Sequence, residues 1–185
     1  MRHLDTLRGA LRRLAKQEQF RLRVIGTPDY ELDGVEVEAM QWRSQTEVED
    51  FRPIDIGVMP LPDGPWSQGK CGLKALQYMA LGIPTVCSLV GVNSDIIRDG
   101  DNGFLAASED EWVAKLTRLL RSVELRKRLG LAGRLTVENK YSTTIQVPRV
   151  YSIFESVVLG RKQRPAGSAS ATRFTSSSRR KEWRS

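Results

Sequence analysis

The chain of 185 residues contains only two cysteines, one histidine and no long apolar run. Cys71 and Cys87 are too few for a disulfide framework, and no group of residues has the spacing of metal ligands. No apolar run approaches the ~18 residues that a membrane-spanning helix needs. These shortages argue against a disulfide-rich module, a metalloprotein and a membrane-spanning protein. We therefore expect a globular protein of the cytoplasm with two reduced thiols.

Acidic residues are scarce near the C-terminal end, and this scarcity explains the net charge of +7. Residues 160–185 hold eight Lys or Arg and one Glu, so 21 of the 29 basic and 21 of the 22 acidic residues lie in the preceding 159. The segment is rich in Ser, Ala and Gly, which predicts a disordered basic tail after a domain at 1–159. Its scattered charges favour a solvated extension, with weak contact to an anionic membrane surface as an alternative and no specific binding of nucleic acid.

Helical and strand patterns alternate along residues 1–159. Leu4, Leu7, Leu11 and Leu14 recur at helical spacing and predict an amphipathic helix over residues 3–18. The other expected elements are strands at 20–25, 35–39, 54–61 and 85–88 and helices at 72–81, 108–121, 122–139 and 142–158. This alternation is typical of a parallel sheet covered by helices. The predicted fold class is α/β, a Rossmann-like parallel sheet with helices on both faces.

Two pairs of residues have the spacing of a helix capping box. Ser44-x-x-Glu47 predicts the start of a short helix after the strand at 35–39, and Ser108-x-x-Glu111 predicts the start of the helix at 108–121.

The segment Gly69–Pro84, GKCGLKALQYMALGIP, is the most informative part of the chain. It follows an apolar strand and a loop rich in Pro and Gly, and it places two glycines and a lysine before a predicted helix. A strand, a glycine loop and a helix N-terminus in this order present free backbone N–H groups to an anion. The residues that we expect to bind phosphate are Lys70, Cys71, Gly72 and Leu73.

Gly72 and Lys74 of this segment could each affect how a phosphate binds. Gly72 has no Cβ, so the backbone can approach a phosphate closely there. Lys74 lies one turn into the predicted helix, where a phosphate contact and a solvated surface position are about equally expected.

A P-loop is a second interpretation of the same region. Residues 64–71 match G-x-x-x-x-G-K-[ST] except at the last position, where Cys71 lacks the hydroxyl that would hold Mg²⁺. Pro65 has no N–H to offer a phosphate, and Trp66 is bulky for a tight cradle. The sequence therefore disfavours a P-loop NTPase.

Five segments in order resemble the donor-binding C-terminal domain of GT-B glycosyltransferases of family GT4. They are DIGVMPL at 55–61, the segment at 69–84, TVCS at 85–88 with VGVN at 90–93, DGDNGFL at 99–105, and the helices with Leu125-Arg126 and Gly133-Arg134. The resemblance covers residues 55 to about 141. It implies the C-terminal half of a GT-B fold that binds a nucleotide-sugar. It also implies sugar transfer with retention of configuration and without a metal or another cofactor.

The resemblance exposes a departure at the donor site. Members of the family usually carry two glutamates separated by seven residues, the first on the donor sugar and the second on the nucleotide ribose. The matching positions here are Gly69, which offers only backbone, and Gln77, whose amide can still hydrogen-bond ribose hydroxyls. Gln68, beside Gly69, is a further candidate for the sugar. No catalytic side chain is assigned.

The resemblance also places the end of the strand at 35–39 against the nucleobase. The residues there are Gln41 and Trp42. Trp42 either stacks on the base or packs beneath the following helix, which is the commoner role of a lone aromatic residue. His3 has no carboxylate partner in view, and no catalytic role is expected for it.

Several parts of a complete GT-B enzyme have no counterpart in this chain. They are the acceptor-binding N-terminal domain, the strand that would precede the helix at 3–18, and the basic residues that follow that strand. We therefore expect an incomplete donor domain that is inactive alone, with an acceptor-binding domain on another chain as one source of the missing half. A sheet that lacks one strand exposes an unpaired edge. The competing hypothesis is a non-enzymatic nucleotide- or partner-binding module.

Overall fold

The computed structural model describes residues 3–162. The chain divides into two compact units, residues 1–146 and residues 147–185. The boundary expected between residues 159 and 160 stays a prediction, because residues 163–185 of the expected disordered tail lie outside the described part.

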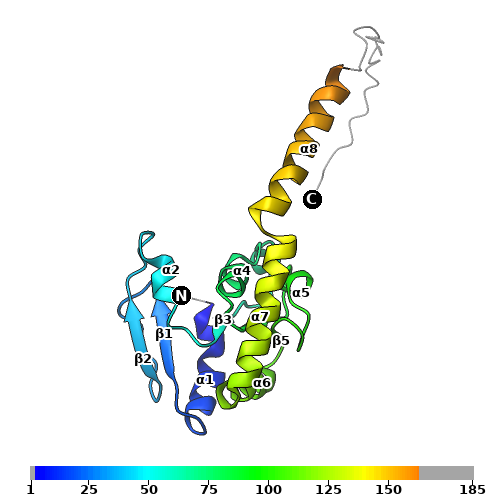
Figure 1. The fold of residues 1–185 in the computed structure, drawn as a ribbon. Coiled ribbons are helices and arrows are strands. Elements are labelled where there is room, and N and C mark those ends of the chain that lie inside the picture. Colours follow the sequence, from blue (N-terminus) through cyan, green and yellow to red (C-terminus); the bar gives the residue numbers. More distant parts are fainter. Residues whose placement is uncertain (1–2, 163–185) are drawn as a thin grey trace, which may run out of the picture. The chain divides into compact units, whose positions relative to one another are not determined.

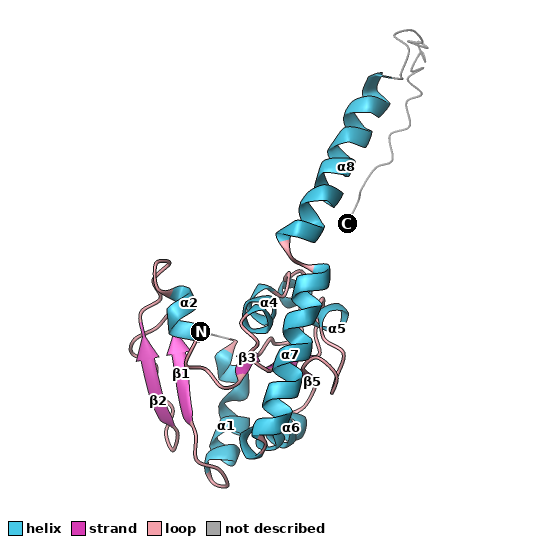
Figure 2. Ribbon diagram, in the orientation of Figure 1, coloured by secondary structure: helices cyan, strands magenta, loops and turns pink. Residues whose placement is uncertain are grey.

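The first unit contains five parallel strands in two separate sheets (Figures 1 and 2). β1 (Arg21–Ile25) pairs with β2 (Glu36–Met40), so that Leu22 lies opposite Val37. The second sheet has the order β3-β4-β5, with β3 at Gly57–Met59, β4 at Thr85–Ser88 and β5 at Phe104–Ala106. The Rossmann-like α/β class is confirmed, but one continuous sheet was expected and the structure has two.

Helices cover both faces of the three-stranded sheet. Val86 and Phe104 contribute to an apolar cluster with α1 and α6, whereas Cys87 and Leu105 contribute to a second cluster with α4. Since neighbouring residues of a strand point to opposite faces, β4 and β5 are buried on both sides, as parallel strands usually are. α1 packs against α6, and α4 packs against α7. Figure 1 labels the helices, which are η1 (Leu4–Leu7), α1 (Arg8–Ala15), α2 (Glu47–Phe51), α3 (Pro65–Gln68), α4 (Leu73–Ala80), α5 (Asn93–Ile96), α6 (Glu109–Arg121), α7 (Val123–Lys140) and α8 (Thr143–Lys162).

Only one of the two expected capping boxes forms. Ser108 Oγ accepts a hydrogen bond from the backbone N–H of Glu111 at 3.3 Å, and Glu111 Oε2 accepts one from the N–H of Ala107 at 2.9 Å. The prediction for α2 is wrong, because Thr46 is the N-cap residue there and makes no side-chain cap. Glu47 is the first residue of α2, and its carboxylate accepts hydrogen bonds from side chains of other elements instead of capping the helix.

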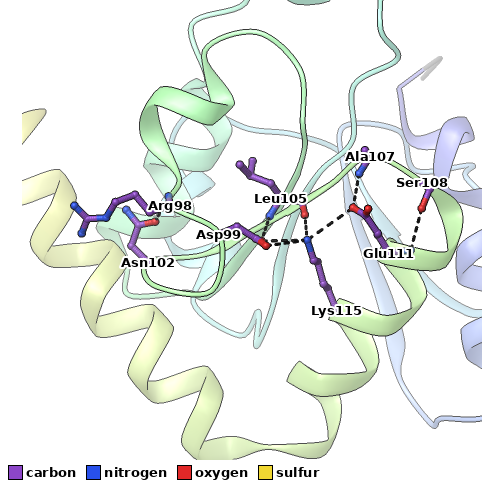
Figure 3. Close-up of polar contacts among 8 residues, drawn as sticks. All are labelled: Arg98, Asp99, Asn102, Leu105, Ala107, Ser108, Glu111 and Lys115. Atoms are coloured by element: carbon purple, nitrogen blue, oxygen red, sulfur yellow. Dashed lines mark hydrogen bonds and ion pairs between the residues drawn. The ribbon is translucent and has the colours of Figure 1, made fainter.

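The turn between α5 and β5 is held by side chains (Figure 3). Asp99 accepts hydrogen bonds from the N–H of Leu105 at 2.8 Å and from Lys115 Nζ at 3.1 Å. Asn102 is fully buried, accepts from the N–H of Arg98 at 2.7 Å and donates to Thr136 in α7 at 3.0 Å. Asp99 and Asn102 thus connect the turn before β5 to α6 and α7.

The second unit is described only through the C-terminal part of α8. Large apolar side chains are exposed along this part of the helix, among them Val150, Ile153, Phe154 and Val157. Within the described residues, α8 and the other helices are each too short or too polar to cross a membrane.

Candidate functional site

The polar segment that follows β3 begins at the carboxyl end of the three-stranded sheet. The N–H of Leu61 donates to Ser88 Oγ at 2.8 Å, which joins the start of this segment to the end of β4. The segment then forms the single turn of α3, which the sequence had predicted as loop. In this turn the N–H of Gln68 bonds Gly64 O at 3.0 Å, and that of Lys70 bonds Ser67 O at 3.1 Å. Two N–H groups that a P-loop would direct at phosphate are thereby occupied, so the P-loop interpretation is disfavoured further.

The N-terminus of α4 offers unpaired donors. Among the described residues, the backbone N–H groups of Cys71, Gly72 and Leu73 have no hydrogen-bond acceptor. They precede a helix of eight residues, whose dipole places positive potential at this end. Cys71 and Leu73 are exposed, so an anion can reach these donors.

Gly72 is required here for a different reason from the one expected. Its φ of 70° lies in the left-handed region that side chains with a Cβ rarely adopt. A Cβ at this position would also collide with the Ile96 side chain of α5. Glycine therefore shapes the turn into α4 and lets it pack on α5, rather than clearing space on the solvent side.

Lys70 and His3 add charge beside these donors. Lys70 is half-buried, and no described carboxylate lies within ion-pair distance of it. Burial, followed by the positive charge of Lys70, lowers the pKa of His3 below its ordinary value. The start of the first helix and the loop before α4 are therefore electrostatic neighbours, which the sequence did not indicate.

Glu47 joins three of the sequence candidates into one cluster. Its Oε1 accepts hydrogen bonds from Lys74 Nζ at 2.8 Å and from Trp42 Nε1 at 3.0 Å, and its Oε2 accepts one from Gln77 Nε2 at 3.3 Å. The Glu47 side chain is 22% exposed. The hydrogen bond from Lys74, then that from Trp42, lowers the pKa of Glu47. We call residues 42, 47, 74 and 77 the Glu47 cluster.

One polar atom of the Glu47 cluster has no hydrogen-bond partner among the described residues. Gln77 Oε1 is buried and has no hydrogen-bond partner in the described part of the chain. Lys74 Nζ also lies 5.0 Å from the centre of the Phe51 ring, which adds a cation–π contact. A buried carbonyl oxygen without a donor is uncommon and indicates a place for a ligand hydroxyl or a water.

The candidates for nucleobase contact lie at the edge of the Glu47 cluster. Trp42 is 46% exposed, and its Nε1 donates to Glu47, the first residue of the following helix. Gln41 is exposed and has no side-chain hydrogen bond to a described residue. Both roles considered for Trp42, stacking on a base and packing against the following helix, stay predictions.

The candidates for sugar contact are Gln68, the last residue of α3, and Gly69, which follows it. Gln68 Nε2 donates to Asp63 Oδ1 at 2.8 Å, and Gly69 is exposed. Asp63 also lines a pocket of about 320 Å³ at the carboxyl ends of β3, β4 and β5, together with Leu61 and Ser88. Trp66 stands beside this region and is 81% exposed.

The sequence interpretation missed two carboxylates. Glu47 bonds Gln77, and Asp63 bonds the neighbour of Gly69, so each position that lacks a family glutamate has a carboxylate close by. Nothing in the sequence links Glu47 to α4, because the partners are 27 and 30 residues apart. Asp63 lies in a segment rich in Pro and Gly, and no sequence pattern there predicted a role for its carboxylate.

The two cysteines differ in their environment. Both thiols are free, with Cys71 exposed and Cys87 buried. Burial raises the pKa of Cys87, so this thiol stays protonated. Residues 3–162 contain no cluster of His, Cys, Asp and Glu that could hold a metal ion.

Comparison with known proteins links this site to one family. Residues 2–122 match the profile of the family described as glycosyl transferases group 1. Among curated proteins, spore coat protein SA of Bacillus subtilis is 27% identical over 125 residues, which are 63% of this chain and 33% of that protein.

Solved structures show the same fold. Sucrose-phosphate synthase of Thermosynechococcus elongatus superposes with a TM-score of 0.71 at 17% identity, over 85% of this chain and 43% of that one. HepE of Anabaena, solved with UDP-glucose, gives a TM-score of 0.62 at 15% identity, over 82% of this chain and 44% of that one. This chain therefore spans less than half the length of these relatives.

The match to the family profile covers more than half of the chain and includes both the Glu47 cluster and the N-terminus of α4. The chain belongs to the glycosyl transferases group 1 family.

Proposed function

We propose that the first unit contains the donor site of a glycosyltransferase and binds a nucleotide-sugar. The observation that carries the proposal is the arrangement on α4, where free N–H groups at residues 71–73 precede a side chain, Gln77, whose buried Oε1 has no partner. One helix thus presents donors for a diphosphate and, one turn further on, an acceptor for a hydroxyl.

The diphosphate would lie at the N-terminus of α4. The N–H groups of Cys71, Gly72 and Leu73 would donate to its oxygens, and Lys70 would contribute a full positive charge. These groups stabilise the negative charge that develops on a leaving nucleoside diphosphate when the sugar–phosphate bond breaks. No metal ion enters this scheme.

The nucleoside would lie over the Glu47 cluster. Gln77 Oε1 accepts a hydrogen bond from one ribose hydroxyl, and Glu47 accepts one from the other after releasing Trp42 or Lys74. The freed Trp42 ring stacks on the base, with Gln41 beside it. Glu47 would thus supply the carboxylate that position 77 lacks.

The sugar would lie between the diphosphate and the pocket at the carboxyl ends of β3, β4 and β5. Gly69 offers its backbone there, and Gln68 and Asp63 offer hydrogen bonds to sugar hydroxyls. The solved complex of HepE with UDP-glucose is a precedent within the fold for such a donor.

The whole reaction extends beyond the residues described. We propose transfer of the donor sugar to an acceptor with retention of configuration, with the acceptor bound outside the described residues. The described residues alone are expected to bind donor without turnover. The expected cytoplasmic location and a weak contact of the basic tail with a membrane surface stay predictions.

A non-enzymatic binding module is the second candidate. Gly69 and Gln77 occupy the positions of the two family glutamates, and neither is a carboxylate. If the chain binds through its basic tail, phosphate affinity resides in residues 160–185 and not at α4.

Substitution of Lys70 separates these two candidates. Lys70→Ala should weaken binding of a nucleoside diphosphate about tenfold, because a charge-assisted hydrogen bond of about 1.5 kcal/mol is lost. Lys127→Ala, an exposed position on α7, is the matched control and should leave affinity unchanged. Calorimetric titration measures both. Equal affinities for the two variants would favour the tail and contradict the donor site.

A further inference from the structure

The turn α3 exposes a tryptophan and buries a serine. Trp66 is 81% exposed, more than any other large apolar side chain of the described residues, whereas the adjacent Ser67 is only 3% exposed. Burial normally favours an indole over a hydroxyl, so the opposite order within one turn is informative. Because a large apolar surface is left in water, this order does not serve the stability of the fold and indicates a contact with a ligand or a partner.

The backbone that carries Trp66 is held in place. The N–H of Gln68 donates to Gly64 O at 3.0 Å and closes the turn. Pro65, at the first position of the turn, has a fixed φ. A Cβ added at Gly91 would lie 2.9 Å from Gln68 O, so the loop after β4 packs directly on this turn. The indole is therefore presented by a fixed turn, and less freedom is lost when it binds a ligand.

The turn lies next to the proposed diphosphate site. The N–H of Lys70 donates to Ser67 O at 3.1 Å, so the end of the turn leads directly into the N–H groups of residues 71–73. In a nucleotide-sugar, the sugar is bonded to the terminal phosphate of the diphosphate. A sugar whose diphosphate is bound at residues 71–73 therefore lies beside the segment that precedes them, which contains Trp66.

The polar groups around the turn suit sugar hydroxyls. Gln68 Nε2 donates to Asp63 Oδ1 at 2.8 Å, and the second oxygen of Asp63 has no partner among the described residues. Asp63 and Ser88 line the same pocket of about 320 Å³, whose other charged lining residue is Glu109. Glu109 is paired with Arg13 at 3.0 Å. The pocket thus offers acceptors for hydroxyls and, among its described lining residues, no cation for an anionic group.

A hexose combines the two features that this region can bind. Its edge carries hydroxyls, and its face carries C–H groups that pack on the face of an aromatic ring. A protein interface would instead need a continuous apolar core. The residues that surround Trp66 in the chain, DGPWSQGK at 63–70, contain no other large apolar side chain. The surroundings of Trp66 therefore favour a sugar over a protein partner.

We propose that Trp66 contacts the donor sugar: its indole packs on the C–H face of a hexose whose hydroxyls bind Asp63 and Gln68. The inference rests on the proposed function, because the sugar reaches this turn as part of a nucleotide-sugar. It assigns the sugar half of the donor to α3 and the diphosphate half to the N-terminus of α4. Affinity for the sugar is then separable by mutation from affinity for the diphosphate.

Calorimetric titration of the full chain tests this separation. The ligands are UDP, GDP and ADP, followed by the glucose conjugate of the diphosphate that binds. Trp66→Ala should weaken binding of the conjugate about tenfold and change the affinity for the free diphosphate by less than about twofold. Trp66→Phe keeps an aromatic face and should recover most of the loss. Leu131→Ala, at a position 62% exposed on α7, is the matched control and should change neither affinity.

The outcomes distinguish the inference from the proposed function. Because Trp66 is exposed, Trp66→Ala should leave the melting temperature unchanged, so that a lost affinity reports the contact and not the fold. Equal weakening of the diphosphate and its conjugate, or no weakening of either, would overturn the inference and leave the diphosphate site in place. Self-association of the unmodified chain that Trp66→Ala abolishes would also overturn it, since Trp66 would then contact a second copy. Absence of binding to all three diphosphates would contradict the proposed function and, with it, the inference.

Discussion

Glu47 shows how one side chain can connect three elements. Its carboxylate bonds Trp42 after β2 and both Lys74 and Gln77 on α4. Hydrogen bonds to the charged form favour that form, which is why the pKa of Glu47 is lowered. The Glu47 cluster therefore holds the loop after β2 against the helix that carries the proposed phosphate site.

This coupling predicts a stability that depends on pH. Because the pKa of Glu47 is lower in the folded state than in the unfolded state, its contribution is present above the unfolded pKa, near 4.5, and is lost as pH falls through the folded pKa. Glu47→Gln should therefore lower the free energy of unfolding by about 1 kcal/mol at pH 6 and by less at pH 3. Urea unfolding at both pH values measures this difference.

Glu49→Gln is the matched control for this experiment. Glu49 lies on the same helix and forms an ion pair with Arg52 at 3.3 Å on the exposed surface. Its replacement should change stability by a few tenths of a kcal/mol at most. A loss for Glu47→Gln that is the same at both pH values would contradict the assigned pKa.

His3 is a built-in probe of the proposed phosphate site. It is the only histidine in the chain, and burial and the charge of Lys70 lower its pKa. A diphosphate bound at residues 70–73 would offset the charge of Lys70, so the pKa of His3 should rise toward 6.5. Proton NMR titration of the imidazole, with and without UDP, measures the shift. An unchanged pKa at saturating UDP would place the ligand elsewhere.

At the scale of elements, α7 packs closely against the end of α4 where Gly130 meets Gly82. A Cβ added at Gly130 would collide with the backbone oxygen of Gly82, which ends the turn after α4. The backbone of both elements must move to relieve this contact, because neither atom belongs to a flexible side chain. The close approach of α4 and α7 thus depends on the absence of a Cβ atom at residue 130.

Gly130→Ala should consequently destabilise the protein by about 1–3 kcal/mol, although alanine is the better helix former. Gly133→Ala, three residues along the same helix, places its Cβ 3.1 Å from Asn102 O and should have a smaller effect. Thermal unfolding of the two variants compares them directly. A higher melting temperature for Gly130→Ala than for the unmodified protein would refute the contact.

Sequence patterns predicted the helices better than the strands. The helix expected at 72–81 is α4 at Leu73–Ala80, and that expected at 122–139 is α7 at Val123–Lys140. By contrast, the apolar run at 54–61 contains only three strand residues, Gly57–Met59. Apolar periodicity reports burial, whereas a strand also needs a neighbour, and one edge of β3 has none among the described residues.

The candidate site was predicted only where its parts are local. The free N–H groups at residues 71–73 follow from the glycine loop and helix pattern, which lies in one segment. The roles of Glu47 and Asp63 depend on which elements fold together, and no local pattern carries that information. The Ser44–Glu47 spacing even predicted a wrong local role for Glu47.

At the scale of the whole molecule, the chain spans only part of its relatives. It covers 33% of spore coat protein SA and 43% of sucrose-phosphate synthase. The donor half and the acceptor half of a glycosyltransferase make separate contributions, so donor affinity can be examined without turnover. The central claim of a nucleotide-sugar site is therefore a claim about binding.

Calorimetric titration of the full chain with UDP, GDP and ADP, each in the presence of a chelator and again with Mg²⁺, tests this claim most directly. We predict saturable binding of one of the three, with one site and the same affinity in both buffers, because the amides and Lys70 bind the diphosphate without a metal. Absence of binding to all three nucleotides, or binding that requires Mg²⁺, would contradict the donor site.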